Sequence, residues 1–159
     1  MADQYSDGNV KVGWVTTLAS ITVPETSEVT AGVDLESFIT PDGLQISLGD
    51  DSVDTSALNS TFSTSKAGRA TVEIELTFKQ QGVGNAPWTT FASRPSGWLV
   101  VRRNVATTTD WANGQLVEVY PCKAGDRKLA PPAANELEKF MVQFFPTSDP
   151  QLHATLTTA

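Results

Sequence analysis

The sequence predicts a mainly β fold, a β-sandwich or partly closed barrel of about seven strands with one or two short flanking helices, in a single domain over residues 1–159. Three observations predict it. Apolar and polar residues alternate along most of the chain, which is the period of a strand with one buried face. Threonine and serine occur in nearly every segment, and β-branched threonine suits a half-exposed sheet. The 11 glycines and 9 prolines supply turns between strands.

The clearest strand covers residues 71–79, where Val72, Ile74, Leu76 and Phe78 share one face. The charged and hydroxyl side chains between them share the other face, so one side is buried and the other contacts solvent. Six further segments show the same alternation or a short apolar run: residues 10–14, 44–48, 98–103, 115–120, 140–145 and 152–157.

Two helices are expected among the strands. Thr30 is a candidate N-cap for the first, which ends at Pro41. The apolar residues of this helix are Val33, Leu35, Phe38 and Ile39. The second covers residues 85–93, with Asn85 as its cap and Pro87 in its first turn.

Residues 48–69 contain few apolar anchors, among them Val53, Leu58 and Phe62. Loops of this length are uncommon inside a compact domain, and three large apolar residues are too many for a solvated linker. The segment is therefore predicted to be a projecting arm or hairpin that orders against a partner.

The formal net charge is −7, and the longest basic run is Arg102-Arg103, which disfavours a protein that grips nucleic acid. Residues 1–80 carry a net −8 and residues 81–159 a net +1, as expected of a subunit whose one face meets the other face of a neighbour. The polar start is not a signal peptide, and no run approaches the ~18 apolar residues of a membrane span.

Motifs for chemistry are weak, and no catalytic residue, cofactor or metal is predicted. Cys122 is interpreted as a small apolar residue and His153 as a sheet-surface residue. Asp50, Asp51 and Asp54 lack the spacing of a calcium loop. The turn at residues 82–85 lacks the Gly-Lys-Ser/Thr of a phosphate loop. Trp111, in a polar loop, is the one tryptophan expected to be exposed, for contact with a neighbour or a ligand.

The order of these features resembles the major tail proteins, the tail tube subunits of long-tailed, non-contractile bacteriophages, particularly those of actinobacterial hosts. The resemblance covers about residues 9–157. The segments that carry it are Val29–Ile39 with Asp42–Leu44, Val53–Phe62 leading to Val72–Phe78, Gly97–Arg103, and Val117–Cys122.

The resemblance implies the phage tail tube fold, six copies in a ring, and rings stacked into a hollow tube through which DNA is ejected. It implies ring contacts by an N-terminal arm at residues 1–10, by residues 48–69 and by a C-terminal strand or arm at residues 146–159. The expected partners are further copies of the chain and the tape-measure, tail-tip and tail-terminator proteins. DNA is expected only as passing cargo, with no membrane partner. Assembly is expected in the bacterial host cytoplasm, and the product in the virion tail.

The residues expected at contacts between subunits or rings are mostly charged or apolar side chains in loops: Asp50, Asp51, Val53, Asp54, Leu58, Phe62, Lys66, Arg69, Arg102, Arg103, Trp111, Arg127, Lys128 and His153. Glu73, Glu75 and Thr77 are expected on either the lumen or the outer wall. Two alternatives stay open. One is the tube protein of a contractile tail or type VI-like secretion system, and the other is a carbohydrate-binding β-sandwich module.

Overall fold

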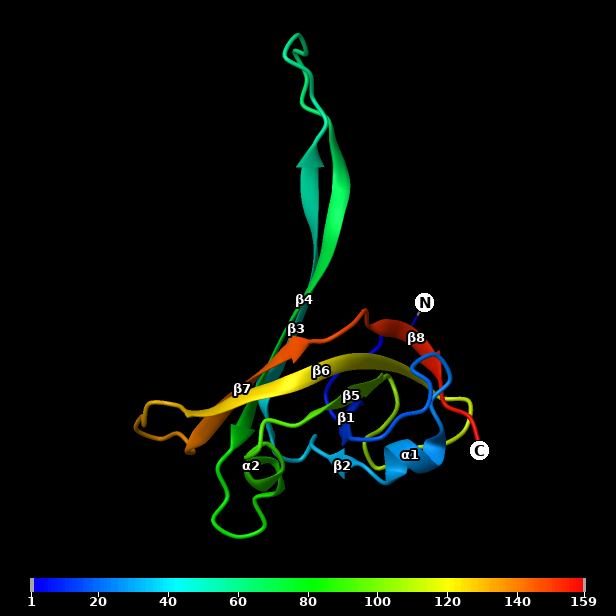
Figure 1. Cartoon of the computed structure of the whole chain (residues 1–159). Helices are drawn as coiled ribbons and strands as arrows, with labels where there is room; N and C mark the ends of the chain where they lie inside the picture. Colours follow the sequence, from blue (N-terminus) through cyan, green and yellow to red (C-terminus); the bar gives the residue numbers. More distant parts are fainter. Residues whose placement is uncertain (1, 159) are drawn as a thin grey trace.

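The structure, a computed structural model, describes residues 2–158. The chain is mainly β, as predicted, with one open antiparallel sheet of eight strands and two short helices (Figure 1). The strands are β1 (Val10–Val15), β2 (Val33–Asp34), β3 (Ile39–Asp54), β4 (Ser65–Lys79), β5 (Ser96–Arg103), β6 (Leu116–Leu129), β7 (Lys139–Pro146) and β8 (Gln151–Thr155). Their order in the sheet is β2-β1-β5-β6-β7-β4-β3. The strand β8 lies outside this order and pairs with β6. The extra strand relative to the seven expected is the two-residue β2.

The central strand β6 has β5 along one edge and both β8 and β7 along the other. β8 pairs with its first part and β7 with its second part, beyond a bulge between Ala124 and Arg127. Gly125 is required in this bulge, because a β-carbon there would lie 2.8 Å from the Gln143 carbonyl oxygen. The bulge lets β6 bend so that β7, β4 and β3 curve over one face of the sheet.

Apolar clusters cover both faces of β1, β5 and β6. On one face, Trp14, Leu99 and Tyr120 pack with the aromatic side chains of β4, α2 and β7. On the other face, Val100 and Val119 pack under the segment that carries the first helix and under β8. Strands buried on both faces need apolar residues at successive positions, which explains the continuous apolar run of β5.

The first predicted helix is wrong in position. The helix α1 covers Thr26–Thr30 and ends where the prediction begins it, with the Thr30 hydroxyl donating to the Thr26 carbonyl at 2.8 Å. Residues 33–39 instead form β2, a turn and the start of β3. The reason is tertiary: the Leu35 N–H donates to the Val12 carbonyl at 2.8 Å, and its side chain is fully buried. These contacts with β1 override the helical spacing of the segment.

The second predicted helix is present as α2 (Ala86–Thr90), with Asn85 at its N-cap position. It is shorter than predicted. Trp88 packs edge-on against Phe140, and Phe91 packs edge-on against Trp14 and Phe144. A helix this short is marginal by itself, and these aromatic contacts with the sheet hold it in place.

We expect Gly97→Ala to destabilise the subunit by about 3 kcal/mol, because a buried strand cannot accept the added methyl group. A β-carbon at Gly97 would lie 2.5 Å from the Val15 carbonyl oxygen and 2.8 Å from the Trp14 ring. The matched control is Gly82→Ala, where nothing lies within 4 Å. Urea denaturation of both variants measures the difference, and equal midpoints would contradict the prediction.

Candidate assembly surfaces

The hairpin of β3 and β4 extends far beyond the rest of the sheet (Figure 1). The two strands pair out to Asp54 and Ser65. β7 pairs with β4 only as far as Ile74, and β3 is the last strand of the sheet. Beyond that point, within residues 2–158, no third strand flanks the hairpin. We call residues 48–54 and 65–72 the free ribbon.

The connecting residues 55–64, the hairpin tip, are held by local hydrogen bonds. The Thr55 N–H donates to the Thr64 carbonyl, and the Thr55 hydroxyl to the Thr64 hydroxyl, both at 2.9 Å. The Ser56 N–H donates to the Asp54 carboxylate at 2.8 Å, and this bond is the main cause that lowers the pKa of Asp54 below its ordinary value. The tip thus has a defined shape although it lies away from the domain core.

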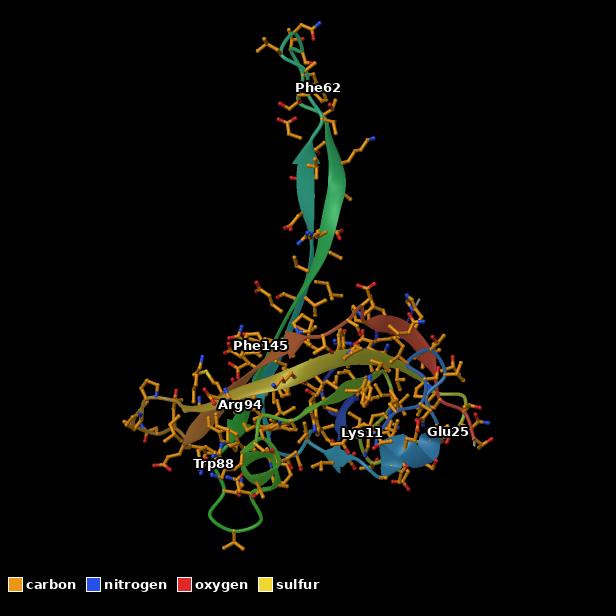
Figure 2. All side chains as sticks on the ribbon, in the orientation of Figure 1. Lys11, Glu25, Phe62, Trp88, Arg94 and Phe145 are labelled. Atoms are coloured by element: carbon orange, nitrogen blue, oxygen red, sulfur yellow. The ribbon has the colours of Figure 1, made fainter. Side chains whose placement is uncertain are left out.

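Large apolar side chains on the free ribbon and tip are exposed. Leu58 is fully exposed, Phe62 is 77% exposed, and Leu48 and Val53 are each about half exposed. Figure 2 shows Phe62 near the far end of the hairpin. A two-stranded hairpin is only marginally stable in water by itself, and open strand edges favour pairing with another chain. The hairpin is therefore the main candidate contact surface of the subunit.

Eight of the residues predicted at contacts lie on this hairpin and are exposed: Asp50, Asp51, Val53, Asp54, Leu58, Phe62, Lys66 and Arg69. Val53 lies directly opposite Lys66 in the ribbon. Within residues 2–158 no three carboxylate, imidazole or thiol side chains form a group that could hold a metal ion. The acidic residues of the ribbon are thus surface charges in the isolated subunit.

Glu73, Glu75 and Thr77 lie on the outward face of β4, opposite its buried residues. Glu75 lies between Gln45 of β3 and Gln143 of β7. The alternation predicted for this strand is confirmed, because Ile74, Leu76 and Phe78 are buried. The outward face of the β3–β4–β7 region is therefore polar at its centre.

Arg102, predicted at a contact between subunits, is fully buried inside one subunit. Its guanidinium donates hydrogen bonds to the carbonyls of Ala106, Thr109 and Asp110 at 2.8–3.1 Å and to the Gln115 side chain at 3.0 Å. Burial lowers the pKa of Arg102, and nearby carboxylates oppose this shift. Arg102 thus holds residues 104–114 in place from within and is not available to a neighbour.

The expectation that Trp111 is exposed is wrong, because its side chain is only 7% exposed. Its indole N–H donates to the Asp34 carboxylate at 3.1 Å, and the Arg102 guanidinium lies 5.1 Å from its ring centroid. Lys11, on the expected solvent face of β1, is also buried, with its amine 3.3 Å from Glu36 and 3.5 Å from Asp34. This network joins segments far apart in the sequence, and no local pattern reveals it.

The other predicted contact residues lie at separate places on the domain. Arg103 is exposed on β5 and forms an ion pair with Glu118 at 3.1 Å. Arg127 is half-buried, stacks 4.0 Å from the Trp88 ring centroid and donates to the Trp88 carbonyl. Lys128 and His153 are exposed on β6 and β8. The structure does not bring these residues together into one site.

The sequence analysis missed Phe145, which is 52% exposed on β7 near the base of the hairpin (Figure 2). It lies opposite Lys123, and its ring lies over Gly125. The sequence did contain a sign of this exposed aromatic residue, because Phe145 occupies a position that the alternation of β7 assigns to the outward face. Phe145 adds apolar area to the outward face of the sheet.

Cys122 is fully buried, as its interpretation as an apolar residue requires, and burial raises the pKa of its thiol from 9.0 to about 12. The unfolded chain therefore releases this proton near pH 9 and the folded chain retains it. We expect stability to fall between pH 9 and about 12, by on the order of 4 kcal/mol from this residue. Denaturant midpoints of the wild type and of Cys122→Ala across this pH range measure the loss of stability that Cys122 causes. If the midpoints of the two proteins fall in parallel as the pH rises, the prediction is wrong.

An open antiparallel sheet with a long, unflanked hairpin defines a class of protein: a β subunit whose free strand edges can pair with another chain. The chain belongs to the phage tail tube protein family, because the model of that family, described as phage tail tube protein, matches residues 1–159. It is thus a structural protein of the phage tail, and the resemblance seen in the sequence is confirmed. None of the helices in residues 2–158 is long and apolar enough to cross a membrane.

Among solved structures, the chain is similar to one in the cryo-EM structure of the anti-feeding prophage baseplate, which is six-fold symmetrised. The two share 8% sequence identity, with a TM-score of 0.60 over 97% of this chain and 98% of that chain. At this identity the likeness concerns the fold. Among curated proteins, none matches the sequence.

Proposed function

We propose that this protein forms six-membered rings that stack into the hollow tail tube through which phage DNA passes at ejection. The observation that carries the proposal is the free ribbon and its tip, which bear exposed apolar side chains and have no covering element in residues 2–158. Other copies of the chain would cover this hairpin in a stacked tube, because a head-to-tail contact repeats from one copy to the next. The six-fold symmetry of the baseplate that contains a chain of the same fold supports rings of six.

The open edge of β3 supports contact within the ring. All 16 residues of this strand lie at the edge of the sheet, so its outer hydrogen-bonding groups face away from β4. A strand from a neighbouring subunit could pair with this edge and continue the sheet around the ring. Exposed polar residues elsewhere, among them Lys128 and His153, are candidates for contacts between rings.

The charge of the chain supports DNA as passing cargo. With a net charge of −7 the subunit repels the phosphate backbone weakly, whereas a basic bore would bind and stall it. Glu73 and Glu75 are candidates for the lumen or for the outer wall. The tape-measure, tail-tip and tail-terminator proteins are the proposed partners, and the bacterial cytoplasm is the proposed place of assembly.

The test is negative-stain electron microscopy with light-scattering mass, on the purified protein and on the protein co-expressed with the tail-tip and tape-measure proteins of its phage. Rings or tubes with six-fold symmetry are the expected result. A monomer that does not assemble even with those partners would contradict the proposal. The carbohydrate-binding alternative loses its main candidate residue, because Trp111 is buried.

A further inference from the structure

A cleft of about 830 Å³ lies between the N-terminal segment, β1 and the start of β3. Apolar side chains line it, namely Val10, Val12, Ile39 and Leu44. Hydroxyl groups also line it, among them those of Ser37, Thr40 and Thr108. We call this the arm cleft, because residues 6–8 form part of its wall.

Three charged side chains line the arm cleft, and two of them, Glu36 and Arg103, are paired within the subunit, whereas the third, Asp7, is exposed to solvent at the rim. The Glu36 carboxylate lies 3.3 Å from the Lys11 amine, and the Arg103 guanidinium lies 3.1 Å from the Glu118 carboxylate. The cleft therefore favours an occupant that is apolar and uncharged, with hydroxyl or amide groups at its edges, because an unpaired charge would lose solvation there.

The hairpin tip has this composition. Residues 55–64 contain no ionisable side chain, and eight of the ten are serine, threonine, alanine or asparagine. The other two, Leu58 and Phe62, are the exposed apolar anchors. An aromatic anchor that fills a pocket, surrounded by polar contacts, is the arrangement of an energetically important interface centre.

The tip and the arm cleft lie at opposite ends of the same strand. Leu44, at the cleft, and Asp54, below the tip, are ten residues apart in β3, which at ~3.3 Å per residue spans about 33 Å. The ribbon pairing holds the tip far from the rest of the domain (Figure 1). The tip therefore cannot fold back into its own cleft. A copy shifted along β3 would bring its cleft to the tip of the first, and repetition of this head-to-tail contact gives an open stack.

We propose that the hairpin tip of one subunit inserts Leu58 and Phe62 into the arm cleft of a second copy in the next ring. This inference rests on the proposed function and names the surface that receives the hairpin. The N-terminal segment then acts as a wall of the receiving site. It is fixed to the domain by a hydrogen bond from the Thr107 N–H to the Gly8 carbonyl at 2.9 Å.

The test is disulfide trapping in assembled tubes, with one cysteine at the tip and one at the rim of the cleft. The variant Thr61→Cys/Ser37→Cys places both at exposed positions. The control Thr61→Cys/Gln81→Cys moves the second cysteine to an exposed position that neither lines the cleft nor lies in a segment expected at ring contacts. The natural Cys122 is fully buried and gives little background.

Under oxidation, tubes of the first variant should give a ladder of covalent multimers on a non-reducing gel, and control tubes should give at least tenfold less. Tubes that form without a ladder, or with equal ladders in both variants, would overturn the docking and leave the proposed function standing. A wild-type protein that forms no tubes with its tail partners would overturn both.

Discussion

Replacement of Leu58 and Phe62 by serine will block tube assembly and leave the melting temperature of the subunit unchanged. Both side chains are exposed in the isolated subunit, so their loss removes no contact that stabilises the fold. In an assembled tube each would be buried, and burial of a leucine or phenylalanine contributes about 1.5–3 kcal/mol. The concentration needed for assembly should therefore rise by at least about 100-fold.

Sedimentation of tubes across a concentration series, together with circular-dichroism melting, measures both parts of this prediction. The control is Val83→Ser, which removes a side chain that is 97% exposed in the turn before α2, outside both the hairpin and the arm cleft. This variant should assemble as wild type does. If the Leu58→Ser/Phe62→Ser variant assembles at the wild-type concentration, the hairpin tip is not an assembly contact.

Arg102→Met should lower the stability of the subunit by about 3–5 kcal/mol, because a buried charge whose two terminal nitrogens donate four hydrogen bonds is removed from its acceptors. Three backbone carbonyls and the Gln115 side chain lose their donor. For a chain of this length the melting temperature should fall by about 10 °C. Residues 104–114 should also become sensitive to protease in the folded protein, since Arg102 holds this loop against β5.

The matched control for this second prediction is Arg103→Met, at the next position of the same strand. Its ion pair with Glu118 is partly exposed, and such pairs contribute about 0–1 kcal/mol. Thermal melts and limited proteolysis compare the two variants. Equal melting temperatures would show that the interior hydrogen bonds of Arg102 do not stabilise the fold.

The features that the sequence predicted correctly depend on local geometry. The alternation in β4 places Ile74, Leu76 and Phe78 in the core, because successive side chains of any strand point to opposite faces. The short helix at residues 86–90 follows from the proline tolerated in its first turn and from its aromatic face. Family membership was also accessible, since the order of strands, turns and the long segment at 48–69 is a property of the chain itself.

The tertiary structure alone decided which polar residues are buried and where the first helix lies. Arg102 was predicted at a contact between subunits and Lys11 lies at a polar position of an alternating strand, yet the loop at 104–114 and the segment around Asp34 cover them. Residues 33–39 have the apolar spacing of a helix, but they form a strand and a turn because Val33 and Asp34 pair with β1. The arm cleft likewise forms from three parts of the chain. Periodicity determines which face of an element a residue occupies, whereas what covers that face depends on segments far away in the sequence, such as Trp111 and its partner Asp34.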